Sequence, residues 1–145
     1  IFMAYINFSI IYSTIIVGGD KMKLLIIGNT SSKCDKLSIK ISDYYEIKIN
    51  KENEYTTKNE INNLVKKNKE WIIEGYNENN IEILFNLAET IIFIDLNKGF
   101  FDKTISIDKE KIYELLKKHI RKGIILKSNK DIKKYLKSMY ESNNY

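Results

Sequence analysis

From Met22 almost to its end, the chain alternates short apolar runs with segments whose apolar residues recur every three or four positions. Continuous apolar runs predict buried strands of a parallel sheet, and the spaced pattern predicts amphipathic helices. The predicted strands cover 23–27, 46–49, 71–75 with its turn, 90–96 and 123–126. Strands alternating with helices, joined by right-handed crossovers, predict a three-layer α/β domain with a doubly wound five-stranded parallel sheet over 22–140.

Capping residues and apolar faces mark the predicted helices. Thr57 and Glu60 form a capping box at the start of one helix, because the spacing of three residues lets each side chain reach the other's backbone N–H. Asp108 or Lys109 opens another helix, and Asp131 is predicted to cap the last one. The apolar positions that these helices would bury are Leu37, Ile41, Tyr44, Ile61, Leu64, Val65, Ile81, Leu84, Phe85, Ala88, Ile112, Leu115, Leu116, Ile120, Ile132, Tyr135, Leu136 and Met139.

The two ends of the chain are predicted to lie outside this domain. Residues 1–19 are uncharged and long enough for a membrane anchor, but they lack the positive flank of a signal sequence. The residues Gly-Gly-Asp-Lys-Met that end at Met22 can be encoded by GGA-GGT-GAT-AAA-ATG, a bacterial ribosome-binding site, spacer and start codon. We therefore expect 1–21 to be translated leader, with a membrane anchor or an added strand or helix as alternatives, and 141–145 to be a frayed tail.

Charge and cysteine content narrow the classes of function. The net charge of +5 comes almost wholly from lysine, because Arg121 is the only arginine. Lysine, asparagine and isoleucine have AT-rich codons, so genome composition accounts for much of the basicity, and no compact basic cluster with interleaved aromatics is visible. Cys34 and His119 are each the only residue of their type, which excludes an intrachain disulfide and a Cys/His zinc site. A cytoplasmic protein is expected.

Four segments in order carry a resemblance to a known family. They are MKLLIIGNT (22–30), EWIIEGYN (70–77), AETIIFIDL (88–96) and the closing helix, strand and helix at 111–139. Together they resemble the small adenylate-kinase-like P-loop proteins often labelled DNA topology modulation proteins, whose corresponding segments include WIIDGNY and ADTIIFLDF. The resemblance covers nearly all of 22–139. It implies a P-loop kinase fold with strand order 2-3-1-4-5, Mg-ATP as cofactor and phosphoryl transfer to a nucleoside or nucleotide.

The phosphate loop departs from the family pattern G-x-x-G-S-G-K-S/T. This chain reads Gly28-Asn29-Thr30-Ser31-Ser32-Lys33-Cys34-Asp35-Lys36. Ser31 and Lys33 replace glycines and resist the backbone angles that let amides wrap a phosphate. Cys34 replaces the phosphate-binding lysine, and Asp35 replaces the hydroxyl residue that would hold magnesium. Lys33 stands one residue early, which rotates a side chain by about 100° on a helix, so rescue of phosphate binding by Lys33 or Lys36 is the alternative.

The lid also departs from the family pattern. In the family, an arginine-rich segment follows the fourth strand and closes over the phosphates, and one arginine that stabilises the transferring group can be worth ~10³-fold in rate. Here the segment 97–103 reads NKGFFDK and is soon followed by the next predicted helix. The lid is therefore expected to be deleted.

A few polar side chains remain as candidates. Glu74 stands where the family places an acid near magnesium through water, and Asp95 ends the fourth strand, so both are weak magnesium candidates or else solvated or capped strand ends. Cys34 is expected to be a small buried side chain, with a reactive thiol at a helix N-terminus as the alternative. His119 is expected to be exposed near the C-terminal end of its helix.

These observations predict a degenerate P-loop kinase-like domain without phosphoryl-transfer activity. A nucleotide such as Mg-ATP would bind weakly, if it binds, at a degenerate phosphate loop made of Gly28, Asn29, Thr30, Ser31, Ser32, Lys33 and Lys36. One alternative is an active kinase-like enzyme with an altered loop. Another is a nucleic-acid-associated regulatory module, and a membrane partner is expected only if 1–19 is an anchor.

Overall fold

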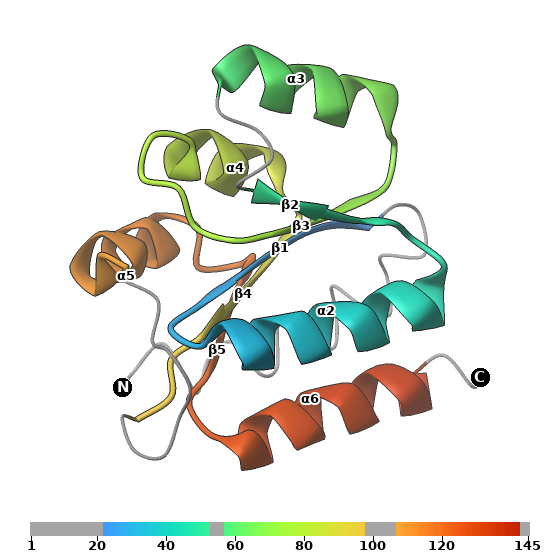
Figure 1. The fold of residues 1–145 in the computed structure, drawn as a ribbon. Helices are drawn as coiled ribbons and strands as arrows, with labels where there is room; N and C mark the ends of the chain where they lie inside the picture. The colour runs from blue at the N-terminus through green and yellow to red at the C-terminus, as the bar shows by residue number, and fades with distance from the viewer. Residues whose placement is uncertain (1–21, 53–56, 98–106, 143–145) are drawn as a thin grey trace.

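Five parallel strands form one sheet in the computed structural model of the chain, which describes residues 22–52, 57–97 and 107–142 (Figure 1). The strands are β1 (Lys23–Gly28), β2 (Ile49–Lys51), β3 (Trp71–Glu74), β4 (Thr90–Ile94) and β5 (Gly123–Leu126). Their order is β2-β3-β1-β4-β5, and every neighbouring pair is parallel. The predicted doubly wound sheet of the P-loop kinase type is therefore confirmed.

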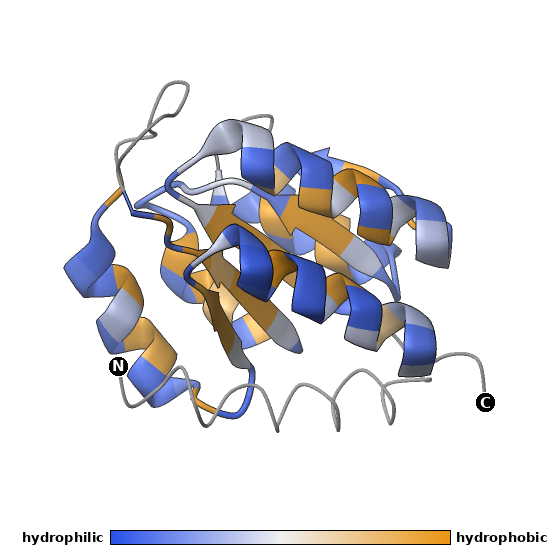
Figure 2. Ribbon diagram, turned by 90° about the horizontal axis from the view of Figure 1, so that it is seen from below, coloured by the Kyte–Doolittle hydropathy of each residue, from blue (hydrophilic) through white to orange (hydrophobic). Residues whose placement is uncertain are grey.

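Helices cover both faces of the sheet (Figure 1). They are α2 (Ser31–Tyr45), α3 (Lys58–Lys67), α4 (Ile81–Leu87), α5 (Lys109–Lys118) and α6 (Asn129–Ser142). Successive residues of a strand point to opposite faces, so Leu24 and Ile26 pack with α2 and α6, whereas Leu25 and Ile27 pack with α3, α4 and α5. Figure 2 shows the result: the strands at the centre of the sheet are mostly hydrophobic, and the helices turn hydrophilic faces outward.

The carboxyl ends of β1, β3 and β4 meet at one edge of the sheet. Ile26 is in register with Glu74, and Gly28 is in register with Ile94. The chain leaves β1 toward one side of the sheet and leaves β3 toward the other side. The gap between the ends of β1 and β3 is therefore the topological switch point, where open α/β sheets bind ligands.

Two predicted helix starts are confirmed. The Thr57 hydroxyl accepts a hydrogen bond from the Glu60 N–H at 3.2 Å, and the Asp108 carboxylate accepts one from the Lys111 N–H at 3.1 Å. Each bond satisfies a backbone donor that the first helical turn leaves unpaired.

The second strand begins three residues later than predicted. Glu46 takes a left-handed conformation (φ 58°) that ends α2, and the Ile47 N–H donates to the Ser42 carbonyl at 3.1 Å. Those two residues therefore complete the helix end, and pairing with β3 starts only at Ile49, opposite Ile72. The prediction of a strand over 46–49 was wrong in position.

The last helix also differs from the prediction at both of its ends. The Ser128 hydroxyl accepts from the Asp131 N–H at 3.1 Å, and the Asp131 carboxylate accepts from the Lys127 N–H at 2.9 Å. Asp131 is thus the third residue of α6 rather than its cap. The helix continues through Ser142, so residues 141 and 142 belong to it, and 143–145 lie outside the described residues.

Smaller differences concern two element ends: β4 stops at Ile94, and α5 stops at Lys118 so that Ile120 lies in the following turn. The predicted leader (1–21) and nearly all of the segment from which the lid is expected to be missing (98–106) lie outside the described residues. Within the described ranges, none of the helices combines the length and the apolar character that crossing a bilayer requires.

Candidate functional site

The connection between β1 and α2 is only two residues long. Asn29 is 8% exposed, and its side chain is held by the backbone of Leu96: Nδ2 donates to the carbonyl at 2.7 Å, and Oδ1 accepts from the N–H at 3.1 Å. Its own N–H donates to the Ile94 carbonyl at 3.0 Å. Asn29 therefore fastens this connection to the end of β4, and its amide is not free to face a ligand.

Helix α2 begins at Ser31, so the loop predicted over 28–32 is shorter than expected. Thr30 is extended (φ −131°, ψ 121°), and the chain is helical from the next residue onward. Among the described residues, positive φ angles occur only at Glu46 and Gly75. A concave nest of amides needs residues that alternate between right-handed and left-handed conformations. The β1–α2 connection does not form one.

Gly28 is explained by packing. A Cβ atom at this position would lie 2.7 Å from the Cys34 Sγ and 2.8 Å from the Ile94 carbonyl oxygen. Only glycine lets α2 approach the ends of β1 and β4 this closely. Cys34 is 3% exposed, and burial, followed by the nearby Glu74 carboxylate, raises the pKa of its thiol to about 12. The prediction of a small buried cysteine is confirmed, and the reactive-thiol alternative is wrong.

A charged network lies beside the switch point, on the α2 face of the sheet. The Lys51 ammonium contacts the Asp35 carboxylate at 2.5 Å and the Glu74 carboxylate at 2.8 Å, and the Ser38 hydroxyl also donates to Glu74. The Glu74 side chain is 6% exposed, whereas those of Lys51 and Asp35 are 41% and 46% exposed. One lysine therefore acts as an internal counter-ion for two carboxylates.

The electrostatics of this network follow from burial and from the short distances. Burial raises the pKa of Glu74, and the neighbouring Asp35 raises it further. The hydrogen bond with Glu74 lowers the pKa of Asp35, and Lys51 lowers it as well. Burial opposes the charge of Lys51, but its bonds to Asp35 and Glu74 outweigh burial and raise the pKa of the lysine. Of the two carboxyl groups, Asp35 is thus the stronger acid.

The structure does not bring Glu74 and Asp95 together. Glu74 shares the strand face of Ile72, under α2, whereas Asp95 follows the opposite face and contacts α5. Asp95 accepts a hydrogen bond from the Tyr113 hydroxyl at 2.5 Å and pairs with Lys109 at 2.7 Å.

Neither carboxylate is a solvated strand end, because their side chains are 6% and 10% exposed. Among the residues that the structure describes, no group of three or more His, Cys, Asp or Glu side chains could hold a metal ion.

A second buried carboxylate, Glu52, lies at the end of β2. It is 2% exposed and accepts a hydrogen bond from the Asn80 amide at 2.9 Å. Burial raises the pKa of Glu52. Gly75 has a φ of 127°, and a Cβ there would lie 3.0 Å from the Glu52 Cβ, so this glycine satisfies both a backbone angle and a close approach.

Sequence reasoning missed Lys51, Glu52 and Ser38. Lys51 and Glu52 depend on where β2 pairs with β3, and that strand was predicted three residues too early. Ser38 lies on α2 and meets Glu74 only through the packing of that helix on β3. The signal was present in the sequence, because a strand that ends at Lys51 places Lys-Glu directly at the carboxyl edge of the sheet.

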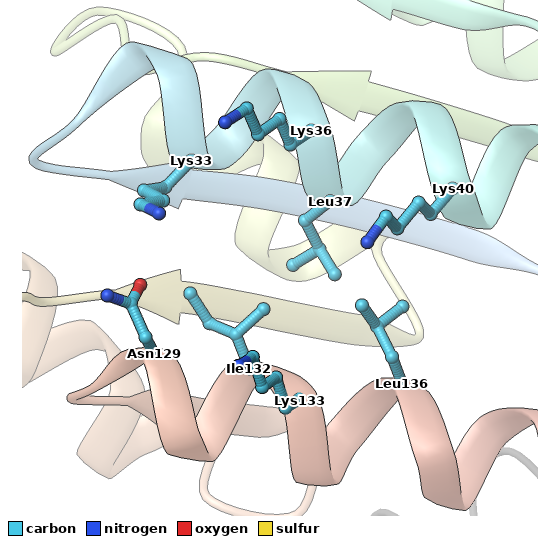
Figure 3. Close-up of a pocket in the computed structure, with 8 residues that line it drawn as sticks. All are labelled: Lys33, Lys36, Leu37, Lys40, Asn129, Ile132, Lys133 and Leu136. Carbon is cyan, nitrogen blue, oxygen red and sulfur yellow. The ribbon is translucent and has the colours of Figure 1, made fainter.

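The other predicted phosphate-loop residues lie on the first turns of α2. Ser31 and Lys36 are exposed, and Ser32 and Lys33 are half-buried. Lys33 and Lys36 line a groove between α2 and α6 (Figure 3). The two lysines predicted as alternatives for phosphate binding therefore also line the groove between α2 and α6.

His119 is less exposed than predicted. It is half-buried at the end of α5, and its ring meets the Phe85 ring edge-on with centroids 5.9 Å apart. Burial lowers the pKa of the imidazole, and the nearby Lys122 and Lys118 lower it further. The neutral ring packs against the core, so the prediction of an exposed side chain was wrong.

The order of the strands and the helices on both faces define a P-loop kinase-like α/β fold. No family model and no curated protein matches the chain. Two solved structures are similar over 83% of this chain and 90% of their own. One is a de novo designed protein with a P-loop NTPase fold, at 18% identity and a TM-score of 0.43, and the other is a gluconokinase from Sinorhizobium meliloti 1021, at 7% identity and a TM-score of 0.44. Both likenesses are distant and assign no activity.

Proposed function

We propose that the chain is a degenerate P-loop kinase-like domain that lacks phosphoryl-transfer activity, acts in the cytoplasm and is related to the adenylate-kinase-like proteins labelled DNA topology modulation proteins. One observation carries the proposal: the β1–α2 connection has two residues, with Asn29 bound to Leu96 and the helix starting at Ser31. A polyphosphate needs a ring of amides at this place, and the short connection offers none.

The charges at the switch point support the same proposal. The predicted position of the phosphate-binding lysine is occupied by the buried Cys34, and Asp35 faces Lys51 instead of a metal. A magnesium ion that approached Glu74 would meet the ammonium of Lys51, 2.8 Å from the carboxylate. The residues present thus do not fit Mg-ATP bound in the P-loop manner.

A weaker capacity for anions is retained at the start of α2. The first turn contains no acidic residue, and the Thr30 side chain makes no cap hydrogen bond. The N-terminus of a helix carries partial positive charge and free N–H groups, which favour a single phosphate. We expect weak binding of one phosphate group at Ser31, Ser32 and Lys33.

The stability of the full chain with and without Mg-ATP tests the proposal. A ligand present at 100 times its Kd adds about 2.7 kcal/mol to the free energy of unfolding. We expect no measurable shift in Tm at millimolar Mg-ATP. A shift of that size would support the alternative, an active enzyme with an altered loop.

A coupled assay with ATP and nucleoside monophosphates tests the chemistry directly, and we expect no turnover. Robust turnover that is lost in Glu74→Gln, with the far-UV circular dichroism of the variant unchanged, would refute the proposal. The glutamine variant is the better choice because it keeps the shape of this buried side chain.

A further inference from the structure

A groove between α2 and α6 gathers four lysine side chains from distant parts of the sequence (Figure 3). Lys33, Lys36 and Lys40 come from α2, and Lys133 comes from α6. The groove has a volume of about 270 Å³, and its remaining lining residues are Leu37, Asn129, Ile132 and Leu136. No carboxylate is among the lining residues.

The positive charge of this α2–α6 groove is not neutralised within the described part of the chain. None of its four lysines forms an ion pair there. Three acidic residues of the same helices are engaged elsewhere: Asp35 pairs with Lys51, Asp131 accepts the Lys127 N–H, and Glu141 lies 3.9 Å from Lys137. The fourth, Asp43 of α2, is not among the residues that line the groove. A cluster of like charges attracts anionic ligands and focuses their approach.

The floor of the groove indicates which anions fit. Leu37 and Leu136 are only 1% and 8% exposed and offer little apolar surface, so the half-buried Ile132 is the main apolar side chain that a ligand can reach. The lining contains no aromatic ring on which a base could stack. The hydrogen-bond donors of the groove are the ammonium groups and the Asn129 amide, which suit charged oxygens.

The spacing of the lysines sets the scale of the ligand. Lys36 lies between Lys33 and Lys40, which are seven residue steps apart on α2, and this corresponds to about 10.5 Å along the helix axis. A B-form duplex advances about 3.4 Å along its axis for each phosphate of one strand, so the row spans about three base-pair steps when α2 lies along the duplex axis. We propose that the α2–α6 groove binds the phosphate backbone of a double-stranded nucleic acid without reading its sequence.

The proposal is tested with the full chain and a labelled duplex, by fluorescence anisotropy over a salt series from about 50 to about 200 mM. The variant combines Lys33→Gln, Lys36→Gln and Lys40→Gln. Each lost phosphate contact reduces the slope of log K against log salt by about 0.9, so we expect the slope to fall by about 2.7. At low salt, Kd should rise on the order of a hundredfold.

The matched control removes three lysines from the other face of the sheet. Lys58, Lys66 and Lys67 are all exposed on α3, so their combined change to glutamine alters the net charge equally. We expect this control to keep the salt slope of the parent. Equal losses in both variants would mean that overall charge, and not the groove, binds the duplex, and would overturn the proposal.

Two further outcomes would also overturn it. One is failure of the parent chain to bind duplex DNA or RNA even at low salt. The other is equally tight, lysine-dependent binding of polyglutamate or of vesicles that contain an anionic lipid, because the groove would then fit an acidic protein or a membrane surface. The ATP experiments use the parent chain, and none of the four groove lysines contacts the Lys51–Glu74 pair. The triple variant also removes Lys33 from the first turn of α2, so it is not used to test the phosphate site proposed there.

Discussion

The sheet ends in two lysine–carboxylate sites, one on each face, and they differ in depth. On the α2 face, Glu74 is 6% exposed and shares Lys51 with Asp35. On the α5 face, Asp95 is 10% exposed, and its partner Lys109 is 50% exposed. Asp95 also has the Tyr113 hydroxyl as a donor at 2.5 Å.

The comparison separates a cation shared by two carboxylates from a cation that serves one. If Lys51 is removed, Asp35 and Glu74 are left side by side with only the Ser38 hydroxyl donating to Glu74, whereas Asp95 without Lys109 is a single carboxylate that keeps the Tyr113 hydrogen bond. The switch point of this fold, where a ligand would be expected, is thus the place that depends most on a charge supplied by the chain itself.

The largest effect is expected for Lys51→Met. Breaking a fully buried pair costs about 3–5 kcal/mol, and because the Lys51 side chain is 41% exposed we expect about 2 kcal/mol. Urea unfolding at neutral pH measures the loss. Lys48→Met, at an exposed position just before β2, is the control and should change stability by less than about 0.5 kcal/mol. Equal losses of stability in Lys51→Met and Lys48→Met would contradict the role of Lys51 as an internal counter-ion.

A smaller effect is expected for Tyr113→Phe on the other face. The change removes a hydrogen bond to a charged acceptor but leaves Lys109 beside Asp95, so the free energy of unfolding should fall by about 1–2 kcal/mol. The ring itself packs against Phe93, with centroids 5.4 Å apart, and phenylalanine keeps this contact. A second measurement in the background of Asp95→Asn tests whether the Tyr113–Asp95 hydrogen bond causes this loss. In that background, Tyr113→Phe should lower the free energy of unfolding by less, because the acceptor is no longer charged.

The four long strands could be predicted because each is a continuous apolar run between turn residues. In β2, by contrast, only Ile49 is apolar, and its neighbours Asn50 and Lys51 are polar. The apolar Ile47 drew the prediction toward the helix end, where that side chain is buried instead. A strand of three residues is defined by its partner β3, and this partner is not visible in the local pattern.

The candidate site was only partly predictable for the same reason. Glu74 was found because the segment 70–77 resembles the family in which an acid stands at this position, but Lys51 reaches Glu74 and Asp35 only through tertiary pairing. The lysine groove was missed because its two helices are separated by four strands in the sequence, and along the chain the lysines look evenly spread. Whether the chain has lost catalysis remains a prediction that rests on the phosphate loop.

Lys109→Met should lower stability less than either Lys51→Met or Tyr113→Phe. Lys109 is 50% exposed, and exposed ion pairs contribute about 0.2–1 kcal/mol. We therefore expect a loss of about 0.5 kcal/mol that disappears at high salt, because salt screens exposed charges. The loss in Lys51→Met should persist at high salt, since Glu74 is buried. A loss in Lys109→Met that resisted salt would show that the two sites do not differ in depth.

The pH dependence of stability gives the finest distinction, and it concerns Glu74. Its pKa is raised in the folded state by burial and by Asp35, so between the unfolded pKa and the folded pKa the native chain binds more protons than the unfolded chain. Stability from this group is therefore fully present below the unfolded pKa and is lost as pH rises through the folded pKa. Glu74→Gln should remove this decline, so its stability relative to the parent should improve as pH is raised from acid to neutral.

Asp35 has the opposite sign, because its pKa is lowered in the folded state and its contribution is lost as pH falls. As pH falls, the free energy of unfolding of Asp35→Asn should therefore decrease less steeply than that of the parent. Glu74→Gln should instead change the profile as pH rises toward neutral. Urea unfolding of both variants over the same pH series distinguishes them. If both variants changed the pH profile of stability in the same direction, the pKa values of Glu74 and Asp35 would not be shifted in opposite directions. The two carboxylates beside Lys51 would then be equivalent.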